Sequence, residues 1–183
     1  TCWMAAIAAW LEAWDWRYWA EQVRQARFAL DDAELKPYFP LPAMVTAAFE
    51  CAERLFGLRF TARTDLAGYH PDVAVYQVDS DDGTPVGLFL QDNFARPAKR
   101  SGAWMSVLAQ QHRNSADGQP QLPVVLNNNN FARGEPGTPT LLSPDDVRTL
   151  FHEFGHGLHG LLSNVGYRRM SGTQVLRDFV ELP

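Results

Sequence analysis

His152, Glu153 and His156 form an HExxH sequence, and these are the residues of the chain whose types and spacing point most directly to chemistry. Four residues advance an α-helix by about 400°, so the second imidazole returns within about 40° of the first, roughly 6 Å further along the axis. Both rings can then reach one metal ion. Glu153 points elsewhere, but its carboxylate can accept a proton from a water at the ion's open position. The motif predicts zinc-assisted hydrolysis of an amide, with two histidine ligands and a glutamate as general base.

A catalytic zinc needs a third protein ligand, and Glu181 is the only glutamate that follows the motif. It lies 25 residues after His156, which leaves room for one helix to end and a second to pack across it. The gluzincin class of metallopeptidases takes its third ligand from such a later glutamate. The alternative metzincin pattern requires a histidine ten residues after the first one, and Leu162 stands there. The sequence therefore favours the gluzincin arrangement, with Glu181 as the third ligand of one zinc ion.

Several other titratable residues have weaker claims to a role. Asp178 precedes Glu181 by about one helical turn and could orient a ligand imidazole, because metal-bound rings usually donate their second N–H to an oxygen. A capping or salt-bridge role for Asp178 is the alternative. We expect His159 to pack or to support the ligands rather than bind the ion. His70 and His112 are expected to be structural or exposed.

A helix over residues 144–163 must carry the motif. Ser143 is a typical N-cap residue, Pro144 suits the first helical position, and two aspartates follow in the positive first turn. Glycines inside a helix cost about 1 kcal/mol each relative to alanine. This helix contains three within a few residues, at positions 155, 157 and 160. We therefore expect another element to approach it closely on that side.

The residues upstream predict further helices and a small β-sheet. A largely helical segment runs from Trp3 to about Ala29, with a break near residues 14–16, and its tryptophans are expected in a core or an interface. The remaining expected elements are a short helix at 31–34, a helix at 43–56 ending at Gly57, strands at 73–78 and 86–90 joined by a hairpin loop, a basic connection at 94–102, a helix at about 103–111, a polar loop at 112–123, and a strand at 123–126 closed by 127–130. The strand at 123–126, with the asparagines that follow, is either an edge that binds substrate as an added strand or an ordinary strand and turn.

The composition restricts the class of protein. With 183 residues, 46% hydrophobic and 12% aromatic, the chain can form one globular domain with a substantial core. A net charge of -5 with both signs spread along the sequence argues against a nucleic-acid partner, and no segment predicts a membrane partner. Cys2 and Cys51 are far apart and form no CxxC pair, which fits a reducing, cytoplasmic location. Because the chain does not begin with Met, we expect it to be part of a longer protein.

Several blocks of the chain, taken together and in order, resemble the thimet oligopeptidase family of zinc metallopeptidases. They are WDWRYWAEQVRQARFALDDAELKPYF at 14–39, YHPDV at 69–73, ARPAKRSGAWM at 95–105, DDVRTLFHEFGHGLH at 145–159 and SGTQVLRDFVELP at 171–183. Within the family the chain is most similar to the bacterial peptidyl-dipeptidase type, followed by the oligopeptidase A type. The resemblance implies a mainly α fold with a small β-sheet, an incomplete gluzincin catalytic domain of the neurolysin-like type, and a channel that admits short oligopeptides. It also implies that His152, His156 and Glu181 bind zinc and that Glu153 is the base.

The resemblance carries three functional expectations. The first is zinc-dependent release of C-terminal dipeptides from short peptides. The second is internal cleavage of the same peptides, with the same chemistry. The third is a metal- or peptide-binding fragment without activity, because family members hold their substrate with tyrosine and histidine side chains that follow the segment matched here. Residues 1–183 are accordingly expected to be a partial catalytic domain.

Overall fold

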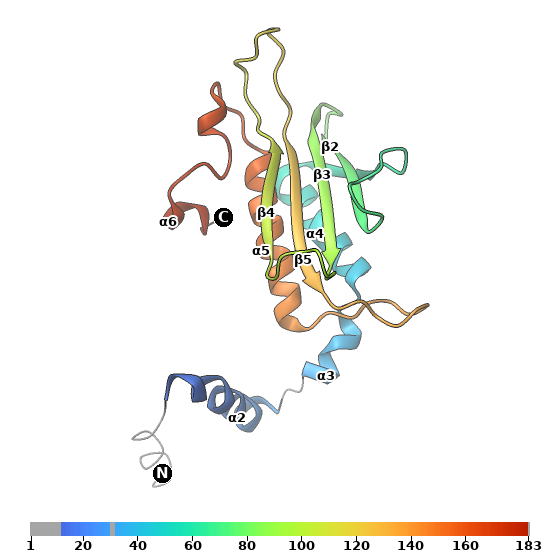
Figure 1. Cartoon of the computed structure of the whole chain (residues 1–183), viewed down its shortest axis with the longest axis vertical. Coiled ribbons are helices and arrows are strands. Elements are labelled where there is room, and N and C mark those ends of the chain that lie inside the picture. Colours follow the sequence, from blue (N-terminus) through green and yellow to red (C-terminus); the bar gives the residue numbers. More distant parts are fainter. Residues whose placement is uncertain (1–11, 30–31, 183) are drawn as a thin grey trace.

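The computed structural model describes residues 12–29 and 32–182, coloured along the chain in Figure 1. The 3-10 turn η1 (Ala13–Asp15) leads into α2 (Trp16–Phe28), which confirms a helix after residues 14–16, where the break was predicted. The earlier part of that predicted helix, from Trp3 to Leu11, and Cys2 lie outside the described residues. α2 projects away from the rest of the chain, and the tryptophans at 14, 16 and 19 are exposed, so the expected core packing is wrong. Their role in an interface stays a prediction.

A short helix and a long one follow before the first strand. α3 (Asp32–Leu35) and the 3-10 turn η2 (Lys36–Tyr38) lead to α4 (Leu41–Phe56). α4 ends where predicted, because Gly57 adopts a φ of 66° that suits glycine and its N–H binds the carbonyl of Glu53. No helix among the described residues is both long enough and apolar enough to cross a lipid bilayer.

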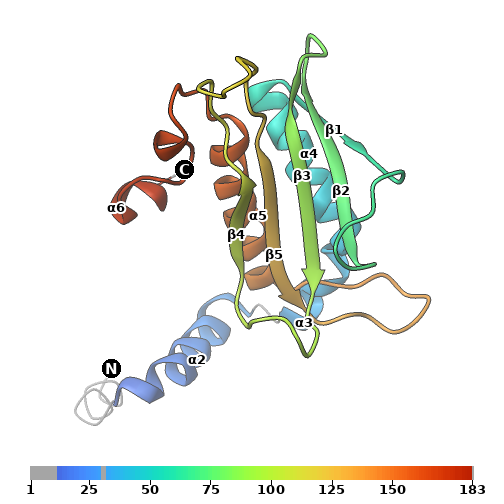
Figure 2. The same cartoon turned by 45° about the horizontal axis from the view of Figure 1, so that its top comes forward.

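A five-stranded mixed sheet forms the centre of the structure. Its strands are β1 (Leu58–Ala62), β2 (Val73–Ser80), β3 (Pro85–Phe94), β4 (Trp104–Ala109) and β5 (Val124–Phe131), in the spatial order β1-β2-β3-β5-β4. Among the strand pairs of the described residues, β3–β5 is parallel and the other three are antiparallel. α4 and α5 (Pro144–Leu161) lie on one face of the sheet, as Figures 1 and 2 show. The predicted hairpin of two strands is confirmed as β2 and β3, and the sheet is larger than the small one expected.

Two expectations for the second half of the sheet are wrong. The segment predicted as a helix at 103–111 is the strand β4, because its pairing with β5 outweighs the helical propensity of its alanine, methionine and leucine residues. The asparagines expected to close the strand at 126 instead lie inside β5, where Asn127, Asn128 and Asn129 are buried. β5 pairs with β3 on one side and β4 on the other, so it is no edge. The edge strand at this side of the sheet is β4.

The core lies between the sheet and the two helices that cover it. Phe89 of β3 is fully buried and contacts Phe154 of α5 edge to face, with ring centroids 5.6 Å apart. α5 approaches the sheet closely at its glycines, since a Cβ at Gly160 would lie 3.0 Å from a methyl of Val125. A Cβ at Gly157 would lie 3.2 Å from the Phe89 ring. The close approach predicted from these glycines is confirmed, and it fixes the motif helix against the strands.

Candidate metal centre

The helix that carries the HExxH sequence begins at a complete capping box. The hydroxyl of Ser143 accepts the backbone N–H of Asp146 at 3.1 Å, and the Asp146 carboxylate accepts the backbone N–H of Ser143 at 2.9 Å. Together these bonds satisfy two donors at the start of α5 that would otherwise lack partners. α5 ends at Leu161, two residues before the predicted end. The sequence signals for this helix are therefore confirmed.

His152, His156 and Glu181 converge on one point in the structure. The Nε2 atoms of the two histidines are 3.1 Å apart, and Oε2 of Glu181 lies 3.4 Å from the first and 3.5 Å from the second. Four ligands about 2.0–2.1 Å from a tetrahedral zinc ion are separated by about 3.3–3.4 Å from one another. The observed separations match this spacing within a few tenths of an ångström. The donor set of two imidazoles and a carboxylate also suits zinc, so the three residues fit one ion.

Glu181 reaches the histidines because the chain folds back sharply after α5. The hydroxyl of Ser163 accepts the backbone N–H of Gly172 at 3.0 Å. Gly172 has a φ of 54°, and a Cβ there would lie 3.0 Å from Cα of Gly160, so the returning segment is tight against α5. The segment then forms α6 (Arg177–Val180), and Glu181 is its C-cap residue. The second helix that we expected to carry the acid is thus a single short turn.

The surroundings of the site bias the protonation of two of its members. Burial lowers the pKa of His156, and the nearby His152 lowers it further, while Glu181 opposes the shift. His156 is therefore kept neutral at neutral pH, which is the form that can bind a metal. Burial also raises the pKa of Glu153. The electrostatic interaction with His152 opposes this rise in the Glu153 pKa, and that with Glu181 adds to it. A carboxylate with a raised pKa has the greater proton affinity that a general base requires.

A cleft of about 400 Å³ opens over these residues. One wall consists of the motif side chains and Glu181. The lining also includes Ala103, which directly precedes the edge strand β4, and Trp104 and Met105, the first two residues of that strand. Thr173 and Val180 complete the lining. The backbone of Met105, in the edge strand, acts to lower the pKa of Glu153 and so opposes the rise caused by burial. A chain lying in this cleft would meet an open strand edge and the candidate metal centre together.

The other singled-out residues lie outside the group of candidate ligands. Asp178 is exposed, and among residues 12–29 and 32–182 no hydrogen bond joins it to either ligand imidazole, so its orienting role stays a prediction. His159 packs against Phe179, with ring centroids 6.3 Å apart. The ring of His70 accepts the backbone N–H of Asp72 at 3.2 Å. The backbone of His112 forms an isolated antiparallel β-bridge with that of Gln121. These three histidines are placed as expected.

The sequence interpretation missed the wall of the cleft formed by β4. A signal was present, because Met105 and Val107 alternate with a serine and face α5 at Gly160. Such alternation is typical of a strand with one buried face. The helix formers in the same segment concealed it.

Comparison with known proteins relates the chain to one family. Residues 5–183 match the family model described as peptidase family M3. A dipeptidyl carboxypeptidase of Salmonella typhimurium is 46% identical over 174 residues, which are 94% of this chain and 25% of that protein. Oligopeptidase A of Escherichia coli is 40% identical over 174 residues, with the same shares of 94% and 25%. A thimet-like oligopeptidase of Dictyostelium discoideum is 38% identical over 158 residues, or 85% of this chain and 23% of that protein. The chain thus spans about a quarter of the length of these relatives.

Proposed function

The chain belongs to peptidase family M3, and on that premise we propose that its residues form the metal-binding part of a gluzincin catalytic domain of the neurolysin-like type. His152, His156 and Glu181 would hold one zinc ion. The observation that carries this proposal is that their ligand atoms all lie within 4.8 Å of one another. When bound, zinc supplies Lewis-acid chemistry and makes a water nucleophilic at neutral pH. Because the relatives are about four times longer, residues 1–183 would be one part of that domain.

Glu153 would move the proton in the reaction. Its carboxylate lines the cleft beside the candidate ligands and is 7% exposed, so it is shielded from bulk water. Its raised pKa brings its proton affinity closer to that needed at neutral pH. The carboxylate would accept the proton of the attacking water and then deliver it to the leaving amine. Burial favours the neutral form of Glu153 after the first step, which makes it a competent acid for the second.

A peptide substrate would bind along β4 as an added strand. β4 has β5 on one side only and its first residues line the cleft. Main-chain hydrogen bonds at such an edge give affinity without requiring particular side chains, which suits a peptidase of short oligopeptides. The strand at 123–126, for which a substrate-binding edge was one of two alternatives, lies inside the sheet as part of β5, so the substrate edge is proposed at β4 instead. No nucleic-acid or membrane partner is proposed, and we propose a cytoplasmic location.

Release of C-terminal dipeptides is the activity that we favour, because the dipeptidyl carboxypeptidase is more similar to the chain than oligopeptidase A, at 46% against 40% identity. Mass spectrometry of the products from free and amidated peptides tests this. Dipeptides released only from free C-termini are the expected result, and internal cuts in amidated peptides would favour an endo-oligopeptidase. The third possibility, an inactive fragment, concerns residues 1–183 alone. We expect weak or absent turnover from that fragment, and rates equal to those of a full-length relative would contradict this.

Glu153→Gln in the full-length protein tests the mechanism. Glutamine has nearly the same size but does not accept the proton, so peptide hydrolysis should fall by at least about a hundredfold. Zinc content should stay at one ion per chain, because Glu153 is no ligand. Glu135→Gln, at an exposed loop residue outside the cleft, is the matched control and should leave both values unchanged. A Glu153→Gln variant with the full rate would remove Glu153 from the mechanism.

A further inference from the structure

The connection between β3 and β4 crosses the end of another strand. β5 lies between β3 and β4 in the sheet, and it runs parallel to β3 and antiparallel to β4. Residues 95–103, here called the crossover, must therefore pass over the C-terminal end of β5 before the chain enters the edge strand. The last residue of the crossover, Ala103, already lines the metal cleft. The position of the crossover thus determines where the cleft wall begins.

Lys99 binds the crossover to the C-terminal ends of the parallel strands β3 and β5. Its ammonium donates to the main-chain carbonyls of Asp92 at 2.8 Å and of Phe94 at 3.2 Å, and also to that of Asn129. The register between β3 and β5 shifts between Asp92 and Phe94, which leaves strand carbonyls without their regular partners. The lysine supplies the missing donors. Its side chain is only 4% exposed, so these bonds are shielded from water.

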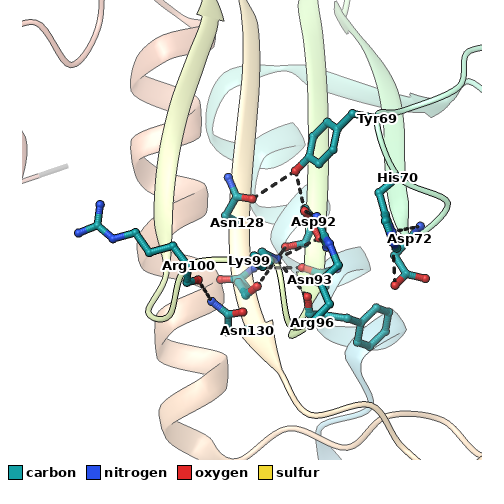
Figure 3. Close-up of polar contacts among 12 residues, drawn as sticks. Tyr69, His70, Asp72, Asp92, Asn93, Arg96, Lys99, Arg100, Asn128 and Asn130 are labelled. Atoms are coloured by element: carbon teal, nitrogen blue, oxygen red, sulfur yellow. Dashed lines mark hydrogen bonds and ion pairs between the residues drawn. The ribbon is translucent and has the colours of Figure 1, made fainter.

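Asp92 provides the countercharge for this buried lysine. Its carboxylate lies 3.0 Å from the Lys99 ammonium and is completely buried. Arg96 donates to both oxygens, at 2.7 and 2.6 Å, and the Tyr69 hydroxyl donates at 2.6 Å. Figure 3 shows these side chains meeting at the carboxyl ends of the strands. A network around a buried carboxylate and a buried ammonium, with every member partnered, has one favoured arrangement, and it therefore holds the first half of the crossover in place.

Asn130 holds the second half of the crossover in place. It is in β5, one residue before the strand ends, and its side-chain amide donates to the carbonyls of Arg100 at 2.7 Å and Gly102 at 2.6 Å. Gly102 has a φ of 87°, a conformation that favours glycine and turns the chain into β4. Both bonded carbonyls lie within three residues of Ala103. The amide of Asn130 is drawn against the crossover in Figure 3.

We propose that Asn130 and Lys99 are positioning residues for peptide binding: by holding the crossover, they set the place of the edge strand β4 relative to the candidate metal centre. The inference rests on the proposed function, in which a peptide binds β4 and the metal at the same time. Neither residue lines the cleft, so neither contacts substrate or metal directly. If the crossover shifts, the edge of β4 moves relative to the candidate metal centre, and one extended peptide can no longer bind both. The metal itself keeps its ligands, which lie on α5 and beside α6.

Two hydroxamates that differ only in their peptide portion separate positioning from general stability. Acetohydroxamate binds the metal alone, whereas a tripeptidyl hydroxamate must satisfy the metal and β4 together. In the zinc-loaded full-length protein, Asn130→Ala should weaken the tripeptidyl hydroxamate about tenfold, since two hydrogen bonds are lost. Its affinity for acetohydroxamate should not change. Asn130→Ser keeps one donor and should give an intermediate loss. Thr138→Ala, which loses a comparable bond from an exposed hydroxyl to the Glu135 carbonyl, is the control and should affect neither ligand.

The outcomes distinguish the inference from the function on which it rests. An equal loss of affinity for both hydroxamates in Asn130→Ala would mean that the residue only stabilises the fold, and this would overturn the positioning role. Unchanged affinity for the tripeptidyl hydroxamate would overturn it as well. If the unsubstituted protein bound neither hydroxamate, the metal site would be refuted, and the positioning role with it.

Discussion

Replacing Asp92 with asparagine should destabilise the fold much more than replacing Asp65 with asparagine. Both carboxylates bond an arginine through two oxygens, Arg96 and Arg63 respectively, at 2.6–2.8 Å. They differ in their surroundings. The Asp92 side chain is completely buried beside Lys99, which is 4% exposed, whereas Asp65 is 63% exposed. Both variants remove one carboxylate charge from an arginine pair, at two different degrees of burial, and Asp92 in addition contacts Lys99 and Tyr69.

The magnitude follows from what each substitution leaves behind. Asp92→Asn leaves the Lys99 charge buried without a countercharge, and removing one partner of a buried ion pair costs about 3–5 kcal/mol. The whole free energy of unfolding of a domain is typically about 5–15 kcal/mol. At the exposed site, water solvates Arg63 once its partner is gone, so the free energy of unfolding should barely change.

Urea unfolding followed by circular dichroism measures both effects. With a slope of about 1–3 kcal/mol per molar urea, a loss of 3–5 kcal/mol lowers the unfolding midpoint by more than about 1 M. The Asp65→Asn midpoint should match that of the unsubstituted chain. Equal midpoints for the two variants would refute the reasoning, because burial would then make no difference to the cost of an unpaired charge.

Three further predictions concern the same fold. Burial acts to raise the pKa of Asp92, but hydrogen bonds from its neighbours outweigh this and hold the pKa well below its ordinary value of 3.8. The contribution of the Asp92 charge to the free energy of unfolding is thus fully present above pH 3.8 and is lost as the pH falls through the pKa of the folded state. The difference in free energy of unfolding between the unsubstituted chain and Asp92→Asn should therefore narrow only in strong acid, and a difference that narrows near neutral pH would contradict this. Gly172→Ala should lower the free energy of unfolding by more than Gly83→Ala. Both residues have a positive φ, which costs an alanine about 1–2 kcal/mol, but only at Gly172 would the new Cβ also lie 3.0 Å from Cα of Gly160. Equal urea midpoints for the two variants would contradict the close packing. Ser143→Ala should lower the free energy of unfolding by about 1 kcal/mol, because α5 loses its N-terminal cap. An unchanged urea midpoint would mean that the capping box contributes nothing to stability.

The sequence predicts the helix α5 and its two candidate histidine ligands because the signals for them are local. The cap at Ser143, the proline after it and the histidine spacing all lie within one stretch of α5, and the structure begins the helix at Pro144. The glycines of that helix also predicted contact with another element, although nothing local says which one. Glu181 was identified by the chemistry of zinc, which needs a third ligand, and by its being the only later glutamate.

The part of the cleft lining that β4 supplies could not be predicted in the same way. Residues 104–109 form a strand only because β5 pairs with them, and β5 begins at residue 124, so the decisive interaction is distant in sequence. The asparagines of β5 look like turn residues, yet Asn129 and Asn130 are strand residues whose backbone or side chain holds the crossover. Lys99 likewise reads as an exposed basic residue. Its burial depends on carbonyls freed by a shift in strand register, and no local pattern reveals that shift.

A crystal structure of the zinc-loaded full-length protein, with the metal located by its anomalous scattering, tests the central claim most directly. We predict one zinc ion with Nε2 of His152, Nε2 of His156 and an oxygen of Glu181 each about 2.0–2.2 Å from it. The start of β4 should face the ion across the cleft. A zinc ion bound elsewhere, or bound by the two histidines with Glu181 beyond coordinating distance, would contradict the account.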